Sequence, residues 1–270
     1  MGGELRGIGR TALWVAMMRA AEGARPDRLF DDRLAGAFVA AAGMDTDMAM
    51  PPGAREFLAV RTRRFDDYLR EACAAGVRQV VLLAAGLDSR AFRLAWPAGV
   101  RLFELDLPAV FEFKEAVLAG HGARAGCTRT TVPADLLGDW PEPLRAGGFD
   151  PAVPTAWLAE GLLVYLPAAD GDRLLAAVTA SSAPGSRFAF DHMDSSAAGQ
   201  AAVRAAAEAV RRMDTGFRSF LDDPVGWPAT HGWRATVARV PELAARYGRP
   251  LPPEVDLPSS DATFLCVAVR

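Results

Sequence analysis

The stretch VVLLAAGLDSRAFRL, residues 80 to 94, decides the fold, because an apolar run passes through a turn into a helical pattern. Such a run ending in a glycine turn is typical of the first strand of a nucleotide-binding α/β domain. A dinucleotide fingerprint places three glycines in this turn, whereas Gly86 stands here alone. The stretch predicts a buried strand and a ligand turn, and it leaves the ligand open.

Short apolar runs alternate with helical segments on the carboxyl side of this turn. Together with residues 77–85, the candidate strands are 101–107, 129–135, 155–166 and 187–192. This alternation predicts parallel strands with helical crossovers, because strands covered on both faces read as continuous apolar runs. A strand at 233–240, a short helix at 241–248 and a final strand at 262–270 close the chain.

Helical patterns dominate the N-terminal part and one later insertion. Helices are expected at 10–22, 26–43, 54–76 and 195–212, and a loop at 221–232. No repeat or long linker divides the chain, so we expect one domain over residues 1–270. It would combine a helical cap (1–75), an α/β core (76–194 and 231–270) and a helical insertion that helps to form a lid (195–230).

Composition excludes several functional classes. The chain has 270 residues, 51% of them hydrophobic, and a net charge of -3, which disfavours nucleic-acid binding. The three cysteines are scattered, which argues against a disulfide framework and against a metal site. No run reaches the roughly 18 apolar residues of a membrane span. We expect a soluble cytoplasmic protein that binds neither metal, nucleic acid nor membrane; its oligomeric state is left open.

Titratable side chains stand where the candidate strands end. Gly86 follows the first strand and Asp106 ends the second, 20 residues later, a separation that suits a carboxylate binding a ribose. Asp135 ends the third strand, Glu160 interrupts the fourth, and His192 follows the fifth. Ligands of open α/β sheets bind at the carboxyl ends of strands, so this set predicts a site.

These residues also have structural interpretations. Gly86 can serve a tight turn, and Asp106 and Asp135 can cap helices. Glu104 competes with Asp106 for the ribose, although it lies deeper in the strand. Glu160 stands in an apolar run, where a carboxylate is costly unless it is paired, so its pattern favours a functional partner.

Arg61 gives an independent indication from the third helix. It stands in the apolar stripe of that helix, three residues after Leu58 and four before Phe65. An arginine on a core-facing stripe needs an anion. That anion is either a structural carboxylate or the carboxylate of a ligand.

The segments LLAAGLDSRAFRL, FELDLPAVFEFK, PADL and AEGLLVYLP resemble the leucine carboxyl methyltransferase superfamily. More narrowly, they resemble its bacterial branch, which includes polyketide O-methyltransferases of the tetracenomycin type. GRTALWVAMMRAAE and AVRTRRFDD resemble the same branch, so the likeness spans most of residues 8 to 193. It implies a Rossmann-like class I methyltransferase fold, with a mostly parallel seven-stranded sheet, and S-adenosylmethionine as the cofactor.

The resemblance also implies how the methionine part of the cofactor is held. Arg61 would bind its carboxylate, and the backbone at Ala84, Ala85 and Gly86 would pass beneath it. Family members often have glycine where this chain has Ala84, and alanine restricts the turn there. Because S-adenosylmethionine has no phosphate, a turn with one glycine suffices, which argues against NAD.

The remaining cofactor contacts are implied in the same way. Asp106, with the adjacent Leu107, would hold the ribose hydroxyls. Asp135 and Leu136 would address the adenine. Glu160 would lie near the amino-acid end of the cofactor.

The acceptor group decides whether a base is needed. A carboxylate is already ionised, whereas a phenol or alcohol must lose a proton. His192 is the best placed base, His231 is the second candidate, and His121 is expected on the surface; Tyr165 could orient the acceptor. We expect an O-methyltransferase of a small molecule, with a carboxyl acceptor favoured over a hydroxyl. The alternatives are a protein C-terminal methyltransferase, a binding-only protein and, last, a nicotinamide-dependent oxidoreductase.

Overall fold

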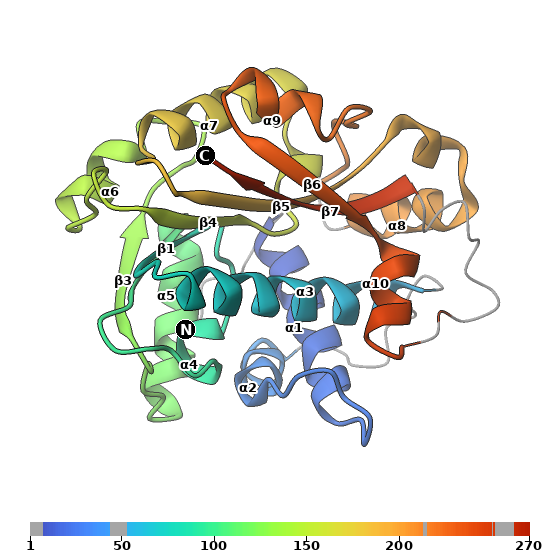
Figure 1. Ribbon diagram of the computed structural model, residues 1–270. Coiled ribbons are helices and arrows are strands. Elements are labelled where there is room, and N and C mark those ends of the chain that lie inside the picture. Colours follow the sequence, from blue (N-terminus) through green and yellow to red (C-terminus); the bar gives the residue numbers. More distant parts are fainter. Residues whose placement is uncertain (1–7, 44–52, 213–214, 250, 252–261) are drawn as a thin grey trace.

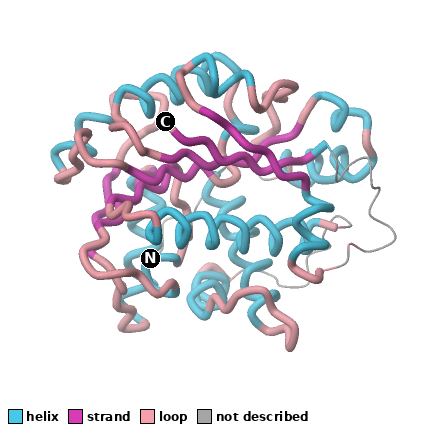
Figure 2. The backbone as a smooth tube through the Cα atoms, viewed as in Figure 1, coloured by secondary structure: helices cyan, strands magenta, loops and turns pink. Residues whose placement is uncertain are grey.

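A single twisted β-sheet lies between two layers of helices (Figure 1). The computed structural model describes residues 8–43, 53–212, 215–249, 251 and 262–270. The seven strands run in the order β3-β2-β1-β4-β5-β7-β6, and Figure 2 shows them as one continuous sheet. The strands β1 to β5 are parallel to one another, and β7 is antiparallel to both β5 and β6. This confirms the mostly parallel seven-stranded sheet.

The strand bounds follow the apolar runs of the sequence. The strands are β1 (Gln79–Leu83), β2 (Arg101–Asp106), β3 (Thr128–Pro133), β4 (Thr155–Ala159), β5 (Arg187–Met193), β6 (Arg234–Arg239) and β7 (Thr263–Val269). From β1 the chain first adds β2 and β3 on one side and then β4 and β5 on the other. The order therefore reverses between β1 and β4, which is where ligands bind in open α/β sheets.

Helices cover both faces of the sheet. Figure 1 shows α6 (Pro141–Ala146), α7 (Ala168–Ala180) and α9 (Gly226–Thr230) on one face, and α3 (Ala54–Ala74), α5 (Pro108–Gly120) and α10 (Val240–Arg246) on the other. The helices α1 (Ile8–Gly23) and α2 (Arg33–Ala41) pack against each other, α1 also on α3 and α2 also on α5. The remaining helices are α4 (Arg90–Arg93) and α8 (Ala201–Arg211), with 3-10 turns at Leu163–Tyr165 and Ser195–Gly199.

Both faces of the central strands are buried, as their continuous apolar sequences predict. On one face, Trp157 of β4 packs edge-on against Trp140, with ring centroids 6.0 Å apart. On the other face, Leu158 lies in the same buried cluster as Phe65 and Leu69 of α3. Two apolar layers thus hold the carboxyl ends of the strands in fixed positions.

Four expected elements differ in their limits. The strand β4 ends at Ala159, because Gly161 turns the chain with a φ of 61°, so Glu160 follows the strand and does not interrupt it. The second helix begins at Arg33, where the Asp32 carboxylate caps it by accepting from the N–H of Ala35 at 3.1 Å. Residues 195–212 divide into a 3-10 turn and α8, and the loop at 221–232 contains α9.

Among the residues that the structure describes, no helix combines the length and the apolarity needed to cross a membrane.

Candidate cofactor and active site

A cavity of about 480 Å³ opens at the carboxyl ends of the parallel strands. The turns that follow β1 to β4 and the end of β5 line it, together with residues of α1, α3 and α8. All but one of the residues predicted for the site line this one cavity, the exception being His231: Arg61, Ala84, Ala85, Gly86, Asp106, Leu107, Asp135, Leu136, Glu160, Tyr165 and His192.

The turn after β1 is tight for two reasons. Ala84 and Gly86 have φ values of 51° and 50°, and Ala84 is the one non-glycine residue with positive φ in the described ranges. A Cβ added to Gly86 would lie 3.3 Å from the Cβ of Ala12 in α1. Glycine is therefore required by the backbone conformation and by the close approach of α1. No phosphate has to be invoked to explain it.

Asp106 fastens this turn to β2. Its carboxylate accepts from the backbone N–H of Gly86 at 2.6 Å and from that of Leu107 at 2.7 Å. Burial raises the pKa of Asp106 above its usual value, against the effect of these two N–H donors. The competing carboxylate, Glu104, is fully buried in an ion pair with Lys114 at 2.7 Å and does not line the cavity. Asp106 is therefore the carboxylate of β2 that faces the ligand space.

Asp135 and Leu136 stand at the outer part of the cavity. Asp135 is exposed, and its carboxylate accepts from the N–H of Leu137 at 2.9 Å. Leu136 is half-buried, while Leu107 and Leu137 are 40% and 55% exposed. Apolar surface of this kind suits a flat heterocycle better than a charged group.

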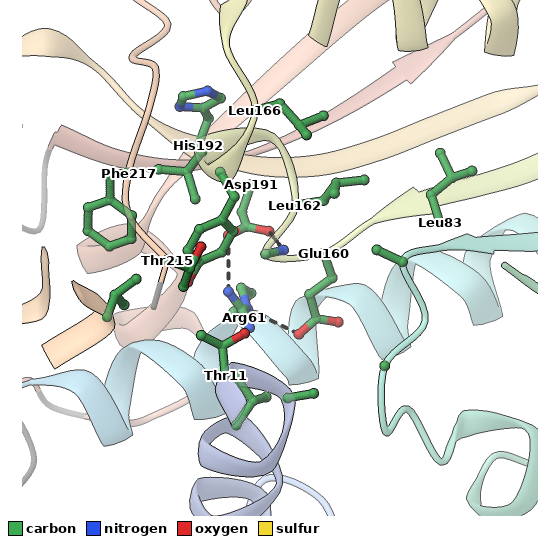
Figure 3. A pocket seen from close by; sticks show the side chains of 18 of the residues that line it. Thr11, Arg61, Leu83, Glu160, Leu162, Leu166, Asp191, His192, Thr215 and Phe217 are labelled. Atoms are coloured by element: carbon green, nitrogen blue, oxygen red, sulfur yellow. Dashed lines mark hydrogen bonds and ion pairs between the residues drawn. The ribbon is translucent and has the colours of Figure 1, made fainter. Parts of the chain in front are cut away.

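Arg61 lies between two carboxylates, Glu160 from the turn after β4 and Asp191 from β5, as Figure 3 shows. Its Nε donates to Glu160 at 3.1 Å, and its Nη1 donates to Asp191 at 3.1 Å. Asp191 also accepts from the N–H of Gly161 at 2.6 Å. Arg61 thus has structural carboxylate partners. No described residue accepts from its Nη2, so that nitrogen can still serve a ligand.

Glu160 extends this arrangement into a larger charged group. Arg90 contacts Glu160 at 2.7 Å and Asp66 at 2.7 Å, and it also pairs with Asp88; Arg93 contacts Asp66 at 2.5 Å. We call the connected set the arginine–carboxylate cluster: Arg61, Arg90, Arg93, Asp66, Asp88, Glu160 and Asp191. It joins α3, α4 and the turns after β1 and β4 to β5.

The cluster has one more carboxylate than it has guanidinium groups. Three arginines face four acidic side chains, which leaves one negative charge in a buried position. Burial opposes ionisation of Glu160, but Arg90 and Arg61 outweigh it and hold its pKa below the usual value. Burial raises the pKa of Asp191, with Arg61 opposing the rise. A buried site with excess negative charge is suited to a cationic ligand group.

Tyr165 and His192 also line the cavity. Burial raises the pKa of Tyr165 to about 12, against the effect of Arg61, so the phenol keeps its proton. Its ring lies 5.7 Å from that of Phe217. Within the described ranges, no side chain or backbone group pairs with the Tyr165 hydroxyl. This hydroxyl can therefore donate to a ligand.

His192 is held in its neutral form. Burial lowers its pKa to about 4, and its Nδ1 accepts from the N–H of Met193 at 2.8 Å. Its Nε2 lies 3.3 Å from the hydroxyl of Ser219, which itself donates to the carbonyl of Leu163 at 3.1 Å. The Nδ1 atom also lies 3.0 Å from the carbonyl of Met193, so that in either tautomer both ring nitrogens face groups of the protein.

The other two histidines do not line the cavity. His231 ends α9, and its Nε2 lies 2.9 Å from Asp172. His121 is exposed at the end of α5, as predicted. The sequence-based suggestion that His231 reaches the cavity is wrong, because the short helix α9 holds it against α7.

Sequence reasoning missed Asp191, Arg90 and Asp66. Asp191 lies in the otherwise apolar run FAFDH, where an acidic residue carries the same signal that was used for Glu160. Its partner Arg61 is 130 positions away in the chain, so the pairing is visible only in the fold.

The sequence matches a known family. The sequence pattern of the leucine carboxyl methyltransferase family matches residues 12–179. The chain belongs to this family. A Parafrankia protein named as an S-adenosyl-L-methionine-dependent methyltransferase is 49% identical over 92% of this chain and 84% of its own length. A Streptomyces coelicolor protein of the same name is 47% identical over 91% and 89%.

Solved structures of methyltransferases share the fold. A Thermobifida fusca protein described as a methyltransferase has a TM-score of 0.62 and 19% identity, and the match covers 94% of both chains. A DUF574 family protein from Streptomyces avermitilis has a TM-score of 0.63 and 14% identity, over 94% of this chain and 96% of the other. At these identities the likeness shows the architecture alone, and it agrees with the methyltransferase fold predicted from the sequence.

Proposed function

We propose that this protein transfers a methyl group from S-adenosylmethionine to a carboxylate oxygen of a small molecule. The observation that carries the proposal is the arginine–carboxylate cluster, whose excess negative charge lies beside a ligand turn with one glycine. S-adenosylmethionine has a sulfonium, an ammonium and a carboxylate, and it has no phosphate. The names of the related proteins support the same cofactor.

The residues present fit this cofactor group by group. Glu160 would face the ammonium, and the unused Nη2 of Arg61 would bind the carboxylate of the methionine part. Asp106 keeps one lone pair on each oxygen beyond its two backbone bonds, and these would accept from ribose hydroxyls. Asp135 and Leu136 would contact the adenine.

The protein's part in the reaction is to position and desolvate. When bound, S-adenosylmethionine supplies an activated methyl group. The buried cluster and helix α1, which lines the cavity, would hold the donor and exclude water from it. The hydroxyl of Tyr165 would donate to the acceptor and orient it.

The acceptor we favour is a carboxylate because neither the imidazole nor the phenol that lines the acceptor side is suited to act as a base. His192 is neutral with its Nδ1 occupied, and the phenol of Tyr165 keeps its proton. A carboxylate needs no proton removed, whereas a hydroxyl does. With the resemblance to polyketide O-methyltransferases, this supports a small secondary metabolite over a protein C-terminus as the substrate.

Matched acceptors test this proposal. Purified protein, labelled cofactor and pairs of carboxylic acids and phenols of equal size should give methyl esters and little methyl ether. Replacing His192→Ala should change ester and ether formation by the same factor, because no step uses the imidazole as a base. Ether formation that exceeds ester formation and collapses in this variant would contradict the proposal and restore His192 as a base.

A further inference from the structure

The cavity has a second end, away from the turn after β1. Figure 3 shows Leu83 on one side of the Arg61, Glu160 and Asp191 group, and Thr215 and Phe217 on the other. Because Leu83 leads into the cofactor turn, the Phe217 side is free for the acceptor. We call it the acceptor end and define it by Tyr165, His192, Val203, Ala206, Val210 and Phe217.

The helix α8 forms a wall of this end. Val203, Ala206 and Val210 line the cavity, and their spacing of three and four residues puts them on one helical face. The side chain of Arg211, next in the helix, lies 4.0 Å from the Cβ position of Gly216, so α8 adjoins the segment that carries Phe217.

The apolar face of α8 is directed at the cavity. Val203 and Ala206 are only half-buried, although both line the cavity, while Arg204 and Glu208 on other faces are exposed. An amphipathic helix normally buries its apolar stripe in the core. This helix leaves part of the stripe uncovered, as a surface for an apolar molecule.

Ionised groups are concentrated at the cofactor end of the cavity. Three charged lining residues come after Tyr165 in the chain: Asp170, Asp191 and Arg218, of which Asp191 pairs with Arg61. Asp170 pairs with Arg173, and Arg218 is exposed to solvent. His192 is uncharged, with its ring nitrogens used by Met193 and Ser219. A second carboxylate buried among the apolar residues of this end, away from the exposed Arg218, would therefore have no partner.

We propose that the acceptor end, with the α8 stripe as its wall, binds the uncharged apolar body of a monocarboxylic acid. The inference rests on the proposed function, and it adds the class of substrate and the residues that select it. The carboxylate oxygen forms a bond to the methyl carbon, the carbon–sulfur bond breaks, and its electron pair stays on sulfur. The products are a methyl ester and a neutral thioether, and no proton is transferred.

Two pairs of probes test the apolar body directly. They are 2-naphthoate with naphthalene-2,6-dicarboxylate, and decanoate with decanedioate, each measured for binding to the protein loaded with S-adenosylhomocysteine and for methylation. We expect at least one monoacid to bind and react about tenfold or more better than its diacid, because the second carboxylate would be buried without a partner.

Two substitutions in α8 locate the subsite. Ala206→Glu places a carboxylate on the stripe and should weaken monoacid binding about tenfold or more. Ala207→Glu makes the same change one position along, on a residue that does not line the cavity, and should leave binding unchanged. Ala206→Leu keeps the wall apolar but narrower, and should shift preference from 2-naphthoate to benzoate.

The outcomes separate this inference from the proposed function. Failure of the protein to bind S-adenosylhomocysteine overturns both. If the cofactor product binds normally, three results overturn this inference alone. They are that neither monoacid binds, that the diacids react as well as the monoacids, or that Ala206→Glu and Ala207→Glu weaken binding equally.

Discussion

Ala84 occupies a backbone conformation that glycine adopts at no cost. Its φ of 51° lies in the left-handed region, which costs an L-residue about 1 to 2 kcal/mol. Glycine would remove this strain. It would also give the unfolded chain more conformational entropy, which lowers the stability by about 0.4 to 1 kcal/mol.

Replacing Ala84→Gly should therefore raise the free energy of unfolding by up to about 1 kcal/mol. Urea denaturation of the two proteins measures this change in the free energy of unfolding. The neighbouring Ala85→Gly is the matched control, because Ala85 has no positive φ, and it should lower stability by about 0.5 to 1 kcal/mol. Equal losses in both variants would show that the turn is not strained at Ala84.

His192 predicts a dependence of stability on pH. Its pKa falls from the usual 6.5 to about 4 on folding, so between these values the unfolded chain binds a proton that the folded chain does not. The free energy of unfolding should then fall as the pH drops through this window, by about 3 kcal/mol in total, and be unaffected above it. Replacing His192→Gln should reduce the fall by that amount in denaturation curves. The same slope in both proteins would argue against a buried neutral imidazole.

At the scale of elements, one carboxylate in α3 holds the helix to the loop after β1. Asp66 is fully buried between Arg90 and Arg93, whereas the adjacent Asp67 is partly exposed and pairs with Arg63 and Arg70. Burial opposes ionisation of Asp66, and the two arginines still hold its pKa below the usual value.

Replacing Asp66→Asn should cost about 3 to 5 kcal/mol, because the buried Arg93 loses its carboxylate partner, while Arg90 keeps only Asp88 and Glu160. Replacing Asp67→Asn should cost no more than about 1 kcal/mol, since its ion pairs are partly exposed. Urea denaturation curves of the two variants give their free energies of unfolding, and the two losses can then be compared. Equal losses would mean that the buried ion pairs of Asp66 stabilise the attachment of α3 no more than the partly exposed ion pairs of Asp67.

The strands and the strand-end residues were open to prediction because both signals are local. An apolar run bounded by a turn predicts β1, and Gly86 with Asp106 predicts a ligand turn, from neighbouring residues alone. The end of β4 was not predictable, because Glu160 sits inside an apolar run and only the φ of Gly161 ends the strand there. Asp191 was missed for a different reason, since its partner Arg61 comes from a distant helix.

The whole molecule places the N-terminal helices over the cofactor end of the cavity. Thr11, Trp14 and Arg19 of α1 line it, and Arg19 donates to the carbonyl of Leu87 in the turn after β1 at 2.6 Å. The same side chain pairs with Asp32 at 2.8 Å, just before α2. Helix α1 is thus bonded to the turn after β1 and to the residue before α2. We therefore expect ligand binding at that turn to stabilise the packing of α1.

Hydrogen exchange can detect this coupling. Addition of S-adenosylhomocysteine should slow amide exchange in α1, which lines the cavity, and leave α6 on the opposite face of the sheet unchanged. Unchanged protection of α1 in the saturated protein would argue that the cap is not part of the site.

The central claim is that the cavity binds S-adenosylmethionine through the cluster and through Asp106, and calorimetric titration tests it most directly. The unchanged protein should bind the cofactor, and Arg61→Ala and Asp106→Ala should each weaken binding at least tenfold, because each removes a charge-assisted hydrogen bond worth about 1.5 to 3 kcal/mol. Asp139→Ala, exposed and outside the cavity, should bind normally. Unchanged affinity in both site variants, with their thermal unfolding transitions intact, would contradict the claim.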